Sequence, residues 1–107
     1  MSPSMRPPRP LPDQEIEARV RAMADWRVEA AYLVREVRFG SFMEGIHFVN
    51  RVAEAAESMD HHPDILISYR QVTLRLTSHD AGGITARDFA LAKRIDTMLA
   101  VDPKATR

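Results

Sequence analysis

The feature that most constrains the fold of this chain is a change of parity among its apolar residues. Every second residue from Ile65 to Tyr69 is apolar, and so is every second residue from Val72 to Leu76, but the first set occupies odd positions and the second even ones. Because successive side chains of a β-strand point to opposite faces, one continuous strand would expose one of the two sets. The pattern predicts two antiparallel strands joined by a hairpin that turns at residues 70–71.

A second pair of strands is predicted between residues 27 and 39. It consists of a short strand near Val28 and a longer one from Tyr32 to Phe39. Alternate residues of the longer strand are apolar, with Arg35 as the exception. Such alternation is typical of a strand with one buried face.

Capping residues mark the starts of three helices. Asp13 is expected to cap the first helix with its side chain. The sequences S-x-x-E and T-x-x-D, which begin at Ser41 and Thr85, are capping boxes for the second and third. The second helix is expected to end at residues 62–63, because the residue before a proline is pushed out of helical geometry.

Each helix has a predicted apolar face, built from residues three or four positions apart. The second helix is the most clearly amphipathic. The predicted faces are Ile16, Val20 and Met23 in the first helix, Phe42, Ile46, Val49, Ala53 and Ala56 in the second, and Leu91, Ile95 and Met98 in the third.

Together these elements predict an α+β fold, a four-stranded antiparallel sheet with three helices on one face in the order α-β-β-α-β-β-α. A chain of 107 residues is long enough for one core, so we expect a single domain over residues 12–102. Residues 1–11 are rich in proline and are expected to form a disordered N-terminal tail, and residues 103–107 a C-terminal tail.

Composition narrows the classes of function. Fifteen basic residues balance fifteen acidic ones, which leaves no global field to attract nucleic acid or an anionic membrane. The chain has no cysteine, so disulfides, thiolate nucleophiles and cysteine-based zinc sites are excluded. No apolar run approaches the length needed to cross a bilayer. We therefore expect a cytoplasmic protein without nucleic-acid or membrane partners.

Three of the four histidines lie where secondary structure is expected to break. His61 and His62 stand at the end of the second helix, and His79 stands at the end of the last strand. The hairpin can bring both breaks to the same edge of the sheet. Glu57, four residues before His61, is expected to share a helix face with it. A carboxylate on one imidazole nitrogen fixes the tautomer of the ring and leaves the other nitrogen available.

These residues do not favour a metal or a phosphate site. Glu57, His61 and His79 could supply three ligands, but the adjacent His61 and His62 diverge and the spacing of a zinc protease is absent. The pair at residues 82–83 is a bare glycine turn, without the lysine or the repeated glycines of a phosphate-binding loop. We expect neither a metal nor another cofactor.

The histidines belong to a longer pattern of spaced residues. The pattern reads Glu57-x3-His61-His62-Pro63-x5-Tyr69-x9-His79-x8-Asp88. It resembles the signature of the pterin-4a-carbinolamine dehydratases, and the resemblance extends over roughly residues 11–99. Trp26, Phe39 and Phe42 match aromatic positions of that family, and residues 77–85 resemble its histidine-containing turn.

The resemblance implies a hydro-lyase that removes water from a 4a-hydroxytetrahydropterin to give the quinonoid dihydropterin, in the recycling of tetrahydrobiopterin. It implies His61, oriented by Glu57, and His79 as the acid–base pair, and leaves open which of them is the acid. Imidazole suits both transfers, because its ordinary pKa of about 6.5 lets it give or take a proton near neutrality.

Other residues are expected to play supporting roles. His62 is expected to position the substrate, and Asp88 to cap the last helix rather than act as a catalyst. Tyr69 and Trp26 are expected in the core. Further substrate contacts, several of them through the backbone, are expected from Asp60, Pro63, Ser78, Asp80 and Ala81.

Two alternatives remain open at this point. Members of the family also serve as a dimerisation cofactor for a homeodomain transcription factor or assist carboxylase assembly, and a relative could act on a different pterin. Retention of all three histidines with Glu57 favours the enzyme. Expected partners are the pterin substrate, an aromatic amino-acid hydroxylase as a functional link, and copies of the same chain. We expect a homodimer or homotetramer, with residues 32–39 as a sheet edge open to pairing.

Overall fold

The computed structural model describes residues 9–101 and 105–106. Three α-helices and a four-stranded antiparallel sheet follow one another in the predicted order α-β-β-α-β-β-α, and a short strand is added at the end. The elements are α1 (Asp13–Arg21), β1 (Arg27–Glu29), β2 (Tyr32–Phe39), α2 (Phe42–Met59), β3 (Asp64–Ser68), β4 (Gln71–Leu76), the 3-10 helix η2 (His79–Ala81), α3 (Ala86–Ala100) and β5 (Ala105–Thr106).

The strands lie in the order β1-β2-β4-β3, and all neighbours are antiparallel. The β3–β4 hairpin is confirmed, but it turns at Tyr69 and Arg70, one residue earlier than predicted. Gln71 already pairs with Ser68, and Tyr69 adopts a φ of 54°. Tyr69 is 72% exposed in this turn, so the expectation that it belongs to the core is wrong.

Strand β2 is an inner strand rather than the sheet edge that the sequence suggested. It pairs with β1 over residues 32–34 and with β4 over residues 33–38, and β1 and β3 are the terminal strands of the sheet. On its β1 side, β5 pairs with residues 38–39. Among the described strands none covers residues 35–37 on that side.

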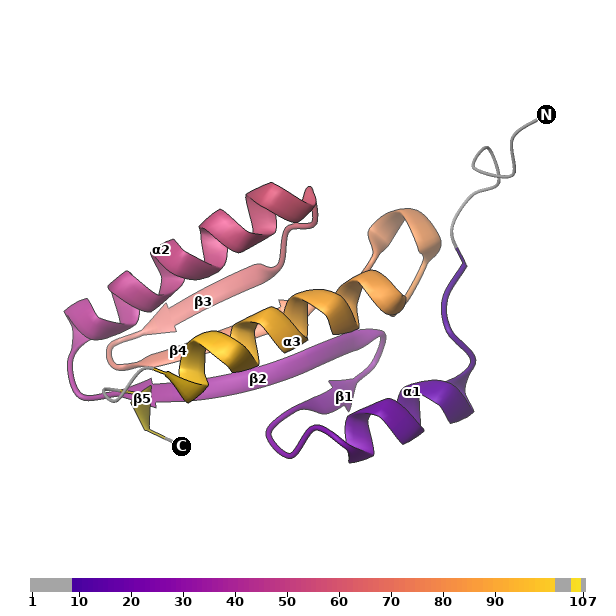
Figure 1. The fold of residues 1–107 in the computed structure, drawn as a ribbon, viewed down its shortest axis with the longest axis horizontal. Coiled ribbons are helices and arrows are strands. Elements are labelled where there is room, and N and C mark those ends of the chain that lie inside the picture. Colours follow the sequence, from indigo (N-terminus) through magenta and orange to yellow (C-terminus); the bar gives the residue numbers. More distant parts are fainter. Residues whose placement is uncertain (1–8, 102–104, 107) are drawn as a thin grey trace.

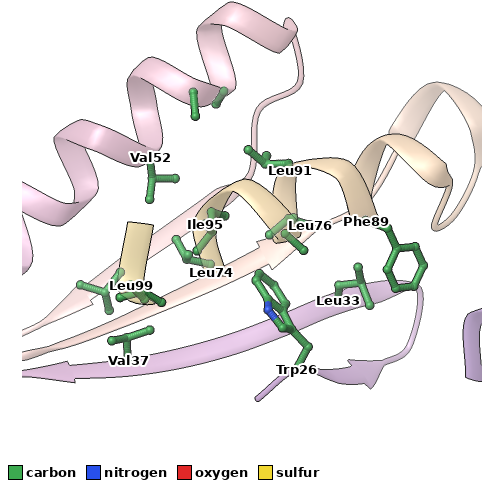
Figure 2. Packing of buried hydrophobic residues seen from close by; sticks show 14 of the residues in the cluster. Trp26, Leu33, Val37, Val52, Leu74, Leu76, Phe89, Leu91, Ile95 and Leu99 are labelled. Atoms are coloured by element: carbon green, nitrogen blue, oxygen red, sulfur yellow. The ribbon is translucent and has the colours of Figure 1, made fainter. Parts of the chain in front are cut away.

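The helices cover one face of the sheet, and the core lies between the two layers (Figure 1). Figure 2 shows Val52 of α2 and Leu91, Ile95 and Leu99 of α3 above the side chains of β2 and β4. The capping box of α3 is complete, because the Thr85 side chain and the Asp88 side chain each bond to the backbone of the other residue. Both box residues are buried, which fixes this helix start against the sheet.

The predicted face of α2 is wrong in part. Phe42 is 45% exposed and Ala53 is exposed, whereas the helix buries Gly45, Phe48, Val52, Ala55 and Ala56. Two stripes of apolar residues at helical spacing run along this helix, and local spacing alone could not decide which one meets the sheet. At Gly45 an added Cβ would lie 3.4 Å from a methyl carbon of Val72, an ordinary van der Waals contact, so α2 packs closely on β4 at this point.

Two helix ends also differ from expectation. Pro12 is the N-cap of α1 and accepts backbone bonds from Glu15 and Ile16, so Asp13 is the first helical residue and not a side-chain cap. Helix α2 ends before Pro63 is reached. Asp60 is left-handed, with a φ of 49°, and backbone bonds from Asp60 to Glu57 and from His61 to Ala56 form a Schellman motif.

A buried cation explains the interruption in the β2 pattern. Arg35 is 3% exposed and faces the helices, where its guanidinium bonds to the Asp96 carboxylate of α3 and lies 3.4 Å from Asp25. Trp26 is buried as expected, and its Nε1 donates to Asp96 at 2.7 Å. The ion pair satisfies a charge that would otherwise be costly to bury.

The ends of the chain are described only in part. Residues 1–8 of the predicted N-terminal tail lie outside the described residues, and the backbone N–H of Leu11 donates to Ile84 at 2.8 Å. Within the predicted C-terminal tail, β5 pairs with β2, and residues 103, 104 and 107 lie outside the described part. None of the described helices is long and apolar enough to span a membrane.

Candidate active site

The two breaks that carry histidines meet at one end of the sheet. In Figure 1 the end of α2 and the η2 turn lie near each other, at the end opposite the β3–β4 hairpin. A pocket of about 340 Å³ opens between them. Its lining residues are Asp60, His61, His62, Thr77, His79, Asp80 and Arg87. Larger cavities, of about 520 Å³ and 680 Å³, lie beside α1 and contain none of the histidines.

His61 is held by a buried carboxylate of another element. Its Nε2 lies 2.5 Å from Oδ1 of Asp88, a residue of α3 that is fully buried. The second carboxylate oxygen of Asp88 accepts the backbone N–H of Thr85 at 2.8 Å and the hydroxyl of Ser78 at 2.9 Å. Asp88 therefore caps its helix, as expected, and also orients the histidine, which was not expected.

The predicted contact between Glu57 and His61 is not formed. Glu57 instead lies 2.5 Å from Nε2 of His62, and both of these side chains are exposed. The reason is the left-handed residue Asp60, at which the chain leaves the helix. An i, i+4 relation holds only within a continuous helix, so His61 turns inward and His62 comes to lie beside Glu57.

The η2 turn supplies the opposite wall of the pocket. His79 is exposed, and its ring meets the ring of Tyr32. Asp80 accepts a hydrogen bond of 2.6 Å from Nη2 of Arg87. This bond to the guanidinium holds the pKa of the Asp80 carboxyl below its ordinary value of 3.8. The pocket thus contains three imidazoles and an ion pair that stays ionised at neutral pH.

The structure divides the predicted substrate-contact residues into two groups. Asp60, His62 and Asp80 line the pocket, whereas Pro63, Ser78 and Ala81 do not. Ser78 is buried, and its carbonyl accepts backbone bonds from the three residues of the turn that follow Asp80. Its hydroxyl bonds to Thr85 and Asp88, so it shapes the turn from behind.

Two pocket residues were missed, Thr77 and Arg87. Thr77 shares the parity of His79 at the exit of β4, and that parity was an available signal. Arg87 follows the N-cap of α3 by two residues, and its contact with Asp80 depends on the path of the glycine turn between them. No local pattern in the sequence predicts that path.

Within the described residues, no group of three or more histidine, aspartate or glutamate side chains could hold a metal ion. Three carboxylates near the histidines are each paired with a different partner. Asp88 holds His61, Glu57 holds His62 and Asp80 holds Arg87. This arrangement provides oriented imidazoles for proton transfer.

Similarity to known proteins agrees with this geometry. Residues 9–98 match the family model described as pterin 4 alpha carbinolamine dehydratase. A relative from Mycobacteroides abscessus is 48% identical over 89 residues, 83% of this chain and 95% of its own, and one from Picosynechococcus is 47% identical over 88 residues, 82% and 96% of the two chains. Both bear the provisional name pterin-4-alpha-carbinolamine dehydratase.

Two solved structures share the fold. A crystal structure of a transcriptional coactivator/pterin dehydratase from Brucella melitensis superposes with a TM-score of 0.79 at 27% identity, and covers 83% of this chain and 97% of its own. A pterin dehydratase-like protein identified as a RuBisCO assembly factor in the alpha-carboxysome has a TM-score of 0.60 at 25% identity, with 71% and 90% covered. By sequence and by fold, the chain belongs to the pterin-4-alpha-carbinolamine dehydratase family.

Proposed function

We propose that the protein removes water from a 4a-hydroxytetrahydropterin by histidine general acid–base catalysis. The observation that carries the proposal is the buried Asp88–His61 pair, which presents an oriented imidazole to a pocket that also holds His62 and His79. The helix cap uses Oδ2 of Asp88, so the bond between Oδ1 and the imidazole is not part of the cap. Membership of the dehydratase family supports the same reaction.

The reaction moves two protons and breaks one bond. A proton leaves N5 of the pterin, the bond between C4a and its hydroxyl oxygen breaks, and the hydroxyl takes up a proton and departs as water. A double bond then joins N5 and C4a. Placed acids and bases accelerate such transfers by roughly 10²–10⁴ each.

We assign the base to His61. Oδ1 of Asp88 accepts from Nε2, so Nδ1 is the bare nitrogen of the neutral ring and can take the proton from N5. The carboxylate stabilises the imidazolium that forms, as in other aspartate–histidine pairs. His61 is almost fully buried and lines the pocket, so a substrate would approach its ring from the pocket side.

We assign the acid to His79, on the opposite wall of the pocket. Its side chain is exposed, so it can recover a proton from solvent after each turnover. His62, held by Glu57, positions the substrate. The Asp80–Arg87 pair lines the pocket on the side of His79. Glu57 thereby becomes a positioning residue for His62 rather than for His61.

Chemical rescue separates the two roles. The purified protein should accelerate dehydration of a 4a-hydroxytetrahydropterin, followed by stopped-flow absorbance, in the presence of a chelator. His61→Ala and His79→Ala should each reduce the rate by roughly 10²–10⁴. Added imidazole should restore part of the rate of His79→Ala, whose site is open to solvent, and not that of His61→Ala. A wild-type protein without activity would refute the proposal, and the reverse rescue pattern would refute the assignment.

The cellular setting is part of the proposal. We propose tetrahydrobiopterin recycling in the cytoplasm, as the partner of an aromatic amino-acid hydroxylase that produces the 4a-hydroxypterin. An assay in which the hydroxylase and this protein are combined tests the link. The protein should suppress the accumulation of the 4a-hydroxy intermediate, and its His61→Ala variant should not.

We also propose that the chain forms a homodimer or homotetramer. The uncovered side of residues 35–37 offers backbone groups to a second copy, and exposed strand edges favour such pairing. Sedimentation equilibrium at micromolar concentration tests this proposal. A single species at the 12.1 kDa mass of the chain would contradict it.

A further inference from the structure

The three histidines of the pocket are held in two different ways. His61 and His62 each meet a carboxylate. The imidazole of His79 forms no hydrogen bond with the described residues, and its ring instead meets that of Tyr32. The ring centroids lie 6.3 Å apart and the planes are inclined by 74°. This T-shaped arrangement is a preferred geometry of aromatic pairs.

Tyr32 is itself held firmly at the start of β2. Arg75 pairs with Val34 on the neighbouring strand, so it lies diagonally across from Tyr32 on the same face of the sheet. Its guanidinium carbon lies 4.3 Å from the centroid of the tyrosine ring, well within the range of a cation–π contact. The hydroxyl of Thr77 donates to the carbonyl of Ala31 at 2.6 Å and ties the start of β2 to the exit of β4.

We propose that Tyr32 is a positioning residue for His79. The tyrosine ring restricts the orientation of an exposed imidazole at the wall of the pocket, and no hydrogen bond to Tyr32 occupies either nitrogen of that imidazole. A carboxylate in its place would occupy one nitrogen and fix one tautomer. With an aromatic neighbour, His79 can release a proton to the substrate from one nitrogen and exchange with water through the other. This inference rests on the proposed dehydratase function.

The test compares two substitutions of the same residue. Tyr32→Leu removes the ring and should lower kcat by about 2- to 10-fold, the range that aromatic pair energies give, with little change in KM. Tyr32→Phe keeps the ring and should retain most of the rate. Tyr69→Leu is the matched control, because Tyr69 also has an arginine over its ring but lies in the hairpin at the other end of β4.

A double substitution shows whether the effect acts through the histidine. In a His79→Ala background, Tyr32→Leu should cause no further loss of kcat. Equal losses in both backgrounds, or loss of rate in the Tyr69→Leu control, would overturn the proposal. Thermal unfolding of each variant shows how much of the protein is folded under the assay conditions, and kcat is compared per folded molecule.

A spectroscopic arm is independent of the reaction. Three-bond couplings between the α and β protons of His79 should indicate one dominant rotamer in the wild type and in Tyr32→Phe, and rotamer averaging in Tyr32→Leu. Unchanged couplings would overturn the proposal. If the wild-type protein lacked dehydratase activity, the proposed function would fail, and these couplings would still decide whether Tyr32 positions the imidazole.

Discussion

Replacement of Asp88 by asparagine is the sharpest perturbation of the site, because it keeps the size of the side chain and reverses one hydrogen bond. The backbone N–H of Thr85 is fixed by the helix start and needs an acceptor, so the amide oxygen of the asparagine must take the place of Oδ2. The amide nitrogen then faces His61. Nε2 of His61 must become the acceptor, and the hydrogen moves to Nδ1, the nitrogen assigned to take the substrate proton.

The expected cost divides between rate and stability. With Nδ1 already protonated, His61 cannot act as the base, and kcat should fall by roughly 10²–10⁴. Each hydrogen bond to Asp88 survives in a neutral form, so the free energy of unfolding should fall by only about 1–3 kcal/mol. Asp88→Ala, which leaves buried donors without an acceptor, should cost more stability, about 3–5 kcal/mol.

Stopped-flow dehydration gives kcat, and long-range ¹H–¹⁵N NMR spectra show which nitrogen of His61 carries the hydrogen. Asp96→Asn is the control on the same helix, since Asp96 accepts from Trp26 and Arg35 and does not line the pocket. It should lower stability and leave kcat unchanged. A folded Asp88→Asn protein with kcat within about 3-fold of the wild type, or with the hydrogen still on Nε2, would refute the reasoning.

Three further substitutions test other parts of the structure. Glu57→Gln should raise KM more than it lowers kcat, and should be milder than any change at His61, because its contact is with the exposed His62; steady-state kinetics decide this. Arg87→Gln should return the lowered pKa of the Asp80 carboxyl toward 3.8, and a ¹³C NMR titration should show this carboxylate protonating at a higher pH than in the wild type. Because that pKa is depressed in the folded state, the pair stabilises the protein above pH 3.8 and ceases to do so as the pH falls through the lowered value. Arg35→Met should lower the midpoint of urea unfolding by the equivalent of about 1–3 kcal/mol, since it removes the cation bound to the partly buried Asp96 and leaves that carboxylate with the bond from Trp26, and an unchanged midpoint would contradict this role.

The order of helices and strands was predictable because its signals are local. Parity along residues 65–76 defines the hairpin, and the T-x-x-D box defines the start of α3. The buried face of α2 was not predictable in the same way, because residues 42 and 46 share one stripe and residues 48 and 52 another. The choice between the stripes depends on the sheet, which is formed by residues distant in the sequence.

The site residues, too, were predictable only where their signal is local in the sequence. The sequence placed the histidines at structural breaks, and the structure brings them to one pocket. The partner of His61 was assigned to Glu57, the nearest carboxylate at helical spacing, whereas the actual partner Asp88 is 27 residues away. Asp60 adopts a left-handed conformation and changes the direction of the chain at the end of α2. Glycine is the usual residue at such a position, so an aspartate gives little warning of it in the sequence.

The complete capping box of α3 would link the proposed catalysis to the timing of folding. The same carboxylate caps the start of α3 and holds a histidine that follows α2, so the two helices must dock before the base is oriented. Helices form on a submicrosecond to microsecond scale, whereas docking of distant segments is slower. During refolding, recovery of enzymatic rate should therefore lag behind recovery of the helical circular dichroism signal and coincide with burial of Trp26, which reaches α3 through Asp96.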